Sequence, residues 1–377
     1  MKKEKNSPIS CAKKTSIGGQ ALMEGIMMRG PEKTAMAVRN PQGEIVIECY
    51  PTATKERTKF FKLPVIRGVF NYIDSMVIGT KSLMRSAEIS GLEEAEAELK
   101  REKEAKKAAK AAKKKKSDES QDEAKPACEC ENVEGLTENE STEDDTKKKK
   151  RDSSAVINVV LAFSVILGIA FSILLFVILP TYMYRGAVYL MPFLKNENPA
   201  VDSLIKSVFE GVLKIVILVG YMAAVSLMKD IKRTFMYNGA EHKAIFCYES
   251  GLELTVENVR NQKRFHPRCG TSFLILMILV GIFVSFFIDP LFYLIFGFTP
   301  ITIVRVLIKL LMLPLIVGVG YELIKIAGRH DNLFTRIISA PGVWLQKITT
   351  KEPDDDMIEC AIAALSEVIP DNGEDNW

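Results

Sequence analysis

Long apolar segments constrain this chain more than any other feature of its sequence. Residues 155–180 contain no charged side chain, and this run exceeds the length of about 20 residues that a helix needs to cross a bilayer. Further apolar segments cover 204–228, 271–288 and 301–326. A helix satisfies its backbone hydrogen bonds internally, as lipid requires. The sequence therefore predicts a mainly α-helical, polytopic membrane protein with about four transmembrane helices.

The end of the third apolar segment needs a separate interpretation. Asp289 and Pro290 follow it directly, and this pair predicts that the helix stops there. Residues 291–300 are apolar but end at another proline. We interpret them as a short re-entrant or interfacial piece before the fourth helix.

The distribution of Lys and Arg orients the predicted helices. Basic residues are concentrated before the first helix, in the loop 229–270 and after the fourth helix, whereas 181–207 and 289–300 contain few. Cytoplasmic loops of membrane proteins carry an excess of Lys and Arg. Four crossings of the cell (inner) membrane with both termini in the cytoplasm satisfy these counts, with the lipid bilayer as the first expected partner.

Outside the apolar segments the composition changes several times. Turn signals such as "PEKT" and "NPQGE" separate short apolar runs near the N-terminus, which predicts a small cytoplasmic β-meander. The apolar and basic residues that follow predict an amphipathic helix that lies on a membrane surface or packs on the meander. We divide the chain into a disordered tail at 1–15, the meander and amphipathic helix at 16–91, a charged low-complexity linker at 92–152, the transmembrane region at 153–328 and a cytoplasmic helical segment at 329–377.

Two functional classes are disfavoured by the sequence. The 377 residues contain 50 basic and 47 acidic side chains, a balance that argues against a nucleic-acid partner. The glycines of "IGGQALMEGIMMRGP" match neither the dinucleotide-binding fingerprint nor a phosphate-binding P-loop. Nucleotide binding is therefore not supported.

Three residues of the loop 229–270 form a candidate metal site. His266 and Cys269 have the H-x-x-C spacing that lets one turn hold a cation, and imidazole with thiolate suits a divalent metal such as zinc. His242 supplies a third ligand and leaves a position open for water. The alternative is structural: His266 precedes Pro267 in an extended turn, and Cys269 is a small buried residue.

Acidic and basic residues near these ligands are candidates for other roles. Glu241 is a candidate general base, although with Asn238 it also resembles a capping box that opens a short helix closed by Gly251. Glu24 is a second candidate for proton transfer. The candidate substrate-binding residues are Arg29, Arg268 and His330, and His330 has an alternative role as a cation at the end of a helix.

Several ionisable residues fall inside the predicted helices, where charge is costly without a partner. Glu210 and Lys214 lie in the second helix, and Arg305 and Lys309 lie one turn apart in the fourth. They either extend to the membrane surface or pair across the bundle, which would open a polar path. Glu322, at the inner end of the fourth helix, needs a partner or completes a polar site.

The motifs "GGQALMEGIMMRGP", "YNGAEHKAI", "HPRCGTSF" and "GRHDNLFTRIISAPGVWLQKITTKEPDDDMIECAIAAL" together resemble the bacterial YqhQ family of membrane proteins. The similarity covers nearly all of the chain apart from its start and the charged linker. The family is described as predicted metal-dependent enzymes. This resemblance implies that Glu241, His242, His266 and Cys269 are site residues, but it supplies neither a substrate nor a reaction.

The sequence thus leads to one favoured function and two alternatives. The favoured function is a metal-dependent, hydrolytic enzyme at the cytoplasmic membrane face, with zinc held by His242, His266 and Cys269. The alternatives are a transporter or channel that uses the intramembrane charges, and a non-enzymatic membrane scaffold. The substrate or protein partner, and assembly into a homo-oligomer, are left open by the sequence.

Overall fold

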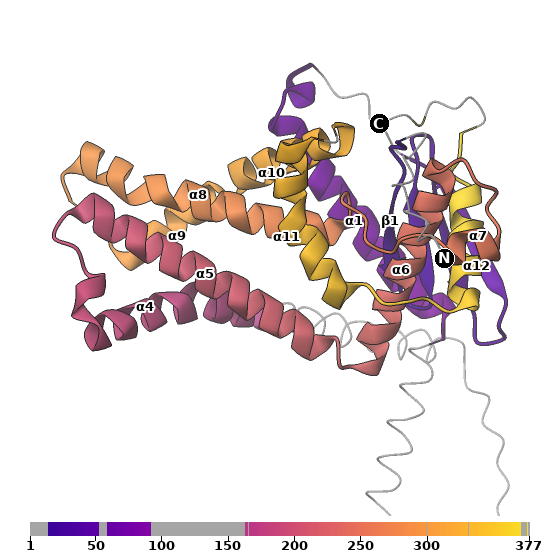
Figure 1. The fold of residues 1–377 in the computed structure, drawn as a ribbon, viewed down its shortest axis with the longest axis horizontal. Helices are drawn as coiled ribbons and strands as arrows, with labels where there is room; N and C mark the ends of the chain where they lie inside the picture. The colour runs from indigo at the N-terminus through magenta and orange to yellow at the C-terminus, as the bar shows by residue number, and fades with distance from the viewer. Residues whose placement is uncertain are drawn as a thin grey trace, which may run out of the picture. The chain divides into compact units, whose positions relative to one another are not determined.

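The computed structural model describes residues 14–52, 59–91, 163–164, 166–298, 300–330, 332–370 and 375. The predicted charged linker lies outside these residues, and so does nearly all of the predicted N-terminal tail. The chain forms two compact units, residues 94–179 and the remainder. The architecture below is that of the larger unit, residues 1–93 and 180–377 (Figure 1).

The predicted β-meander is confirmed as a four-stranded antiparallel sheet. Its strands pair in the order in which they occur in the chain, and Met27 of the second strand faces Met36 of the third. Period-2 alternation sends neighbouring side chains of each strand to opposite faces of the sheet. The strands are β1 (Gly18–Leu22), β2 (Gly25–Arg29), β3 (Lys33–Arg39) and β4 (Ile45–Pro51).

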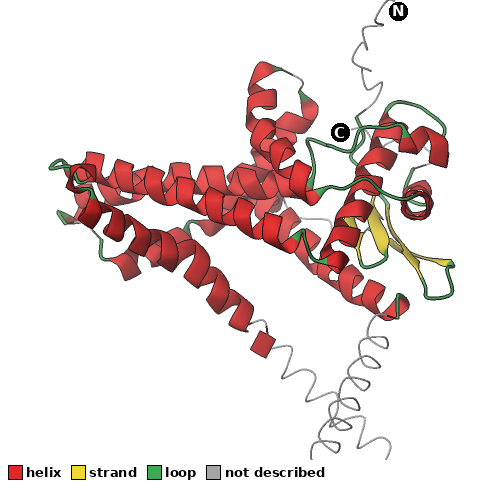
Figure 2. Ribbon diagram, turned by 60° about the horizontal axis from the view of Figure 1, so that its bottom comes forward, coloured by secondary structure: helices red, strands yellow, loops and turns green. Residues whose placement is uncertain are grey.

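Helices cover both faces of this sheet and extend away from it (Figures 1 and 2). α6 and α12 pack on one face, and α1 packs on the other. The helices of the larger unit are η1 (Lys59–Lys62), α1 (Ile66–Ile89), α4 (Leu179–Leu190, from Pro180 on), η3 (Pro192–Leu194), α5 (Pro199–Val225), α6 (Lys229–Glu249), α7 (Val256–Arg260), α8 (Gly270–Phe296), α9 (Thr302–Leu311), α10 (Leu313–Arg329), α11 (Leu333–Thr349) and α12 (Asp355–Ser366).

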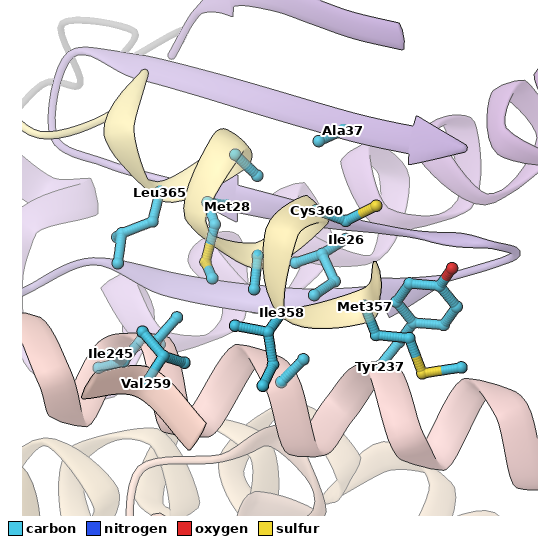
Figure 3. Packing of buried hydrophobic residues seen from close by; sticks show 14 of the residues in the cluster. Ile26, Met28, Ala37, Tyr237, Ile245, Val259, Met357, Ile358, Cys360 and Leu365 are labelled. Atoms are coloured by element: carbon cyan, nitrogen blue, oxygen red, sulfur yellow. The ribbon is translucent and has the colours of Figure 1, made fainter. Parts of the chain in front are cut away.

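The main core lies between the sheet and the helices α6, α7 and α12. Ile26 and Met28 of β2 point to this core, whereas Met27 between them points to α1. Ile358 and Leu365 of α12 share the core with them (Figure 3). Each such side chain contributes about 1.5–3 kcal/mol when fully buried. This core holds α6, which carries the candidate site, against the meander and the C-terminal helix.

One prediction about α6 is wrong. The capping box of Asn238 and Glu241 does not open a helix, because α6 already begins at Lys229. The Asn238 amide instead donates to the carbonyl oxygen of Thr349 (3.2 Å) and to the hydroxyl of Thr350. The Asn238 side chain, which the local sequence predicts to cap a helix, thus forms tertiary hydrogen bonds instead. Gly251, with φ of 68°, lies just beyond the helix end, as predicted.

Three helices are long and apolar enough to cross a membrane, or four if one bent pair counts as a single span, among the described residues. The three are Ile166–Leu190, Val201–Val225 and Ser272–Phe296, and the bent pair is α9 with α10. The protein is therefore a mainly α-helical polytopic chain with a small meander. The membrane-like helices agree with the expected membrane association.

The predicted helix ends near residues 289–300 need correction. α8 does not stop at Asp289 and Pro290 but continues to Phe296 and ends at the left-handed Gly297. Proline is tolerated within membrane helices because neighbouring groups form hydrogen bonds with the backbone groups that the proline leaves without a partner. The predicted fourth helix is broken instead, with a bend of 44° between α9 and α10.

Helix α1 is joined to α10 by close packing and by an ion pair. Gly68 lies so close to Gly318 and Tyr321 that an added Cβ would meet them at 2.8–3.1 Å. Next to it, Arg67 makes a two-pronged pair with Glu322, with N–O distances of 2.7 and 2.5 Å. Glu322 therefore has the partner that its position requires.

Replacing Ile358 by Ala tests the importance of the core between the sheet and α12. Ile358 is fully buried, so its truncation is expected to lower the free energy of unfolding by about 2–5 kcal/mol. Thermal unfolding of the detergent-purified protein, followed by circular dichroism, measures the loss. Ile47→Ala, at an exposed position of β4, is the matched control, and an equal loss in both variants would contradict this core.

Candidate functional site

Polar side chains converge where α6, the loop 261–269 and the start of α8 meet. Glu241, His242 and Glu249 of α6, together with His266 of the loop, are buried. β1 packs against α6 on one side, and α11 packs against α8 on the other. Because these ionisable groups share one buried region, burial and their mutual contacts together decide their charge states.

His242 has one ring nitrogen fixed and the other left open. Its Nδ1 lies 2.6 Å from the carbonyl oxygen of Arg264, so Nδ1 carries the proton and donates it. Its Nε2 is buried and has no hydrogen-bond partner among the residues that the structure describes. Burial lowers the pKa of His242 below its usual value. The ring is therefore neutral near pH 7, with a lone pair on Nε2.

Glu241 lies next to His242 and is held against β1. An added Cβ at Gly19 would meet the Glu241 side chain at 2.8 Å, and the Gly19 backbone N–H donates to the Glu241 carboxyl group. Burial raises the pKa of Glu241 to about 7, and the nearby Cys269 adds to this effect. Because Gly19 has no Cβ, the Glu241 side chain has room to pack against β1.

A second carboxylate, Glu249, is the centre of the site's hydrogen-bond network. Its Oε1 accepts from the Arg268 guanidinium and, at 2.9 Å, from the backbone N–H of Thr15. Its Oε2 lies 3.6 Å from Nε2 of His266. Burial alone would raise the pKa of Glu249, but the hydrogen bond with His266 and the charge of Arg268 hold it below its usual value.

His266 is positioned through its backbone as well as its ring. Its N–H donates to the Gln346 side chain (2.8 Å), and its carbonyl oxygen accepts from the same side chain (2.6 Å). The ring Nδ1 accepts from the Arg268 backbone N–H at 3.3 Å. Burial lowers the pKa of His266 to about 4. Gln346 of α11 thereby fixes the loop that carries the motif "HPRCG".

The two ends of the described chain close over this network. Arg268 donates to the carbonyl oxygen of Thr15 at 2.9 Å. The carboxylate of Asp375 accepts from the hydroxyl groups of Thr15 and Tyr248, each at 2.8 Å. The segments near both termini therefore depend on residues of α6 and of the loop.

The three predicted metal ligands do not converge on one ion. The ring centroids of His242 and His266 are 5.8 Å apart, and both nitrogens of His266 face protein groups. Cys269 is buried at the start of α8. Among the described residues, no group of three or more His, Cys, Asp or Glu side chains is arranged to hold a metal. The open Nε2 of His242 is suited to coordinate a metal ion. His242, His266 and Cys269 together, however, are not arranged as a metal site among the described residues.

Three other predicted residues make contacts elsewhere. Glu24 lies in the β1–β2 turn with φ of 50° and forms a two-pronged pair with Arg233. Arg29 donates to Ser75 on α1, and His330 is exposed at the end of α10. The structure thus gathers Glu241, His242, His266, Arg268 and Cys269. No described hydrogen bond connects Glu24, Arg29 or His330 to this group of residues.

Sequence reasoning missed Glu249 and Gln346. Glu249 is seven residues after His242, a spacing that places both on one face of a helix and could have pointed to it. Gln346 lies 80 residues from His266, and its role follows only from the packing of α11 on α8. No local pattern signals such a contact.

Two comparisons with known proteins support the family resemblance that the sequence motifs indicated. The family model described as "Protein of unknown function (DUF1385)" matches residues 63–371. A Bacillus subtilis (strain 168) protein named "Uncharacterized protein YqhQ" is 29% identical over 360 residues, which cover 94% of this chain and 92% of that protein. No solved structure matches the chain.

The raised pKa of Glu241 predicts a specific pH dependence of stability. The folded state binds this proton more tightly than the unfolded chain does. The resulting stability is complete below the ordinary pKa of 4.5 and is lost as the pH rises through about 7. Glu241→Gln keeps a neutral side chain at every pH, so its melting temperature relative to wild type should rise by about 5 °C between pH 5 and pH 8.

Melting curves at several pH values measure this difference. Glu253→Gln, at an exposed position after α6, is the control and should show no such trend. A difference between Glu241→Gln and wild type that stays constant with pH would show that Glu241 titrates normally.

Proposed function

We propose that this chain, which belongs to the YqhQ family (DUF1385), is a membrane-anchored enzyme that transfers protons through Glu241 and His242. The observation that carries the proposal is the buried Nε2 of His242, which has no described hydrogen-bond partner. A buried polar atom without a partner costs about 1–3 kcal/mol of stability. Such a cost is typical of sites where the atom meets a substrate, a water molecule or an ion.

The two side chains suit opposite roles in hydrolysis. The neutral His242 ring is a base, because its Nε2 can take a proton from water while Nδ1 stays bound to the Arg264 carbonyl oxygen. Glu241, with a pKa of about 7, is protonated in a large fraction of molecules at neutral pH and can give its proton to a leaving group. The hydroxide formed from water adds to the electrophilic centre, and His242 then returns its proton to Glu241.

The remaining groups of the site hold this pair in place. Glu249 and Arg268 fix His266, whose ring centroid lies 5.8 Å from that of His242. Gly19 brings β1 against Glu241. In the proposed enzyme these are positioning residues, and Glu241 and His242 are the groups that meet the substrate.

The membrane placement of the site is part of the same proposal. The site begins where α8 begins, and basic residues occur at the start of α6 and at the end of α10. The excess of Lys and Arg on cytoplasmic loops supports a cytoplasmic site, with both termini on that side and four crossings if α9 and α10 count as one.

Metal dependence is a separate part of the proposal and rests on the sequence. Zinc binding by His242, His266 and Cys269 requires His266 to leave the groups that its ring nitrogens face, so no step above involves a metal. Elemental analysis of protein purified without chelator measures metal content. One equivalent that is lost in His242→Ala would support the metal-dependent form.

The experiment for the enzyme proposal uses purified protein in mild detergent and an extract of cell metabolites and lipids. Mass spectrometry follows which compounds disappear and which products form. Wild type should consume a compound of the extract, whereas His242→Ala and Glu241→Gln should lose at least about 99% of that rate, as expected when a general base or acid is removed.

His330→Ala is the control, because His330 is exposed and lies at the end of another helix. It should keep the wild-type rate. Consumption at equal rates by wild type and His242→Ala, in protein that melts normally, would rule out proton transfer by this pair.

A further inference from the structure

Helix α11 exposes an apolar face. Among the residues that the structure describes, the large apolar side chains exposed on this helix are Leu333 (75%), Phe334 (59%), Ile337 (62%) and Trp344 (53%). Leu333, Ile337 and Trp344 follow one another at spacings of four and seven residues, which places them on one side of the helix. Large apolar patches on a protein surface mark contacts with other proteins or with membranes.

The polarity of α11 differs from that of a helix that faces water. Surface helices of soluble proteins turn apolar side chains to the core and polar ones to solvent. α11 instead buries Thr335 and Gln346 and exposes the apolar face. The candidate spans α5 and α8 behave similarly. Glu210 of α5 is buried and pairs with Lys309 on α9 at 3.6 Å, as the sequence suggested, whereas Phe283 of α8 is exposed.

The opposite side of α11 is fixed on the start of α8. An added Cβ at Gly342 would meet Cα of Ser272 at 2.5 Å, and the Gln346 side chain donates to the Ser272 hydroxyl at 2.9 Å. Ser272 is the first residue of the candidate span Ser272–Phe296. α11 runs across this end of α8 (Figure 1). The helix therefore lies where a candidate span begins, which is the level of a membrane surface.

The composition of α11 suits this level. Tryptophan is enriched at membrane–water interfaces, where its ring meets apolar groups and its N–H meets polar ones. The helix contains two charged residues, Arg336 and Lys347, and both are basic. Helices that lie in the membrane surface combine basic residues with an apolar face of Trp, Phe and Leu.

We propose that the apolar face of α11, formed by Leu333, Phe334, Ile337 and Trp344, lies in the lipid of the membrane surface at the start of α8. Lipid is favoured over a soluble protein partner because the other side of α11 packs on the first residue of a candidate span. This inference does not depend on the proposed enzyme.

One consequence concerns the distance between the lipid and the candidate site. Gln346, on the buried side of α11, contacts the backbone of His266 at 2.8 and 2.6 Å. A helix with its side chains is about 10–12 Å across. The loop that carries His266 is thus separated from the lipid by a single helix.

The test uses the full chain in lipid nanodiscs and the fluorescence of Trp344. The chain has two tryptophans, so Trp377→Phe leaves Trp344 as the only source of the signal. Bromine quenches a tryptophan that touches it, and phospholipids brominated at different carbons place bromine at different depths. The apolar face of an interfacial helix lies about 5–10 Å into the headgroup–acyl boundary, so bromine in the upper part of the acyl chain should lower the emission at least about twofold.

Two further probes, each in a Trp344→Phe, Trp377→Phe background, separate lipid contact from effects of the lipid on the whole protein. Ile337→Trp places a tryptophan on the same face and should be quenched as strongly as Trp344. Gln42→Trp is the matched control, because Gln42 is exposed in the turn between β3 and β4. Its emission should be the same in brominated and unbrominated lipid.

Each outcome decides the proposal. Quenching of Trp344 and of the Ile337→Trp probe, without quenching of the Gln42→Trp control, supports lipid contact by this face. Emission of Trp344 that brominated lipid leaves unchanged would overturn it, whether water, a second copy or another segment of the chain covers the face. Strongest quenching by bromine at the end of the acyl chain would also overturn it, because α11 would then lie deep in the bilayer.

Discussion

The candidate site depends on the buried carboxylate of Glu249. It receives the Arg268 guanidinium and the backbone of Thr15, and it faces the ring of His266. Removing one partner from a buried ion pair costs about 3–5 kcal/mol, because the other charge is left without compensation. One acidic side chain thus joins α6 to the loop before α8 and to the segment of Thr15, which is distant in the sequence. The geometry of His242 and Glu241 follows from this arrangement, since both lie on the same helix as Glu249.

The surroundings of these groups separate the pKa values of side chains of the same type. Glu249 is ionised because it accepts a hydrogen bond from His266 and because Arg268 compensates its charge, whereas Glu241, with only the Gly19 amide as a described donor, titrates near neutrality. His266 is neutral and engaged by its neighbours, and His242 is neutral with an open nitrogen. Two carboxyl groups and two imidazoles of one site therefore take different roles. Pairs of groups whose environments separate their pKa values are typical of acid–base catalysis.

Much of the fold follows from patterns in the sequence, because they are local. Apolar runs predicted the membrane-like helices, and turn signals predicted the meander, since both depend on neighbouring residues. Rules for single residues failed where packing outweighs them: α8 continues through Pro290, and Asn238 bonds to Thr349 rather than capping a helix. The candidate site was located in the sequence through its rare histidines, but Gln346 was missed because an 80-residue separation leaves no local signal.

The protonation state of His242 is the most direct test of its proposed role as a base, and it can be measured by NMR because the chain contains only three histidines. Histidine labelled with ¹⁵N, measured by NMR in detergent at pH 7 and assigned with His266→Ala and His330→Ala, reports each ring nitrogen separately. The contacts of His242 predict a ring with a protonated Nδ1 and an unprotonated Nε2, whose ¹⁵N signal shifts when water access or a ligand changes. A His242 ring protonated at both nitrogens, or at Nε2 alone, would contradict it.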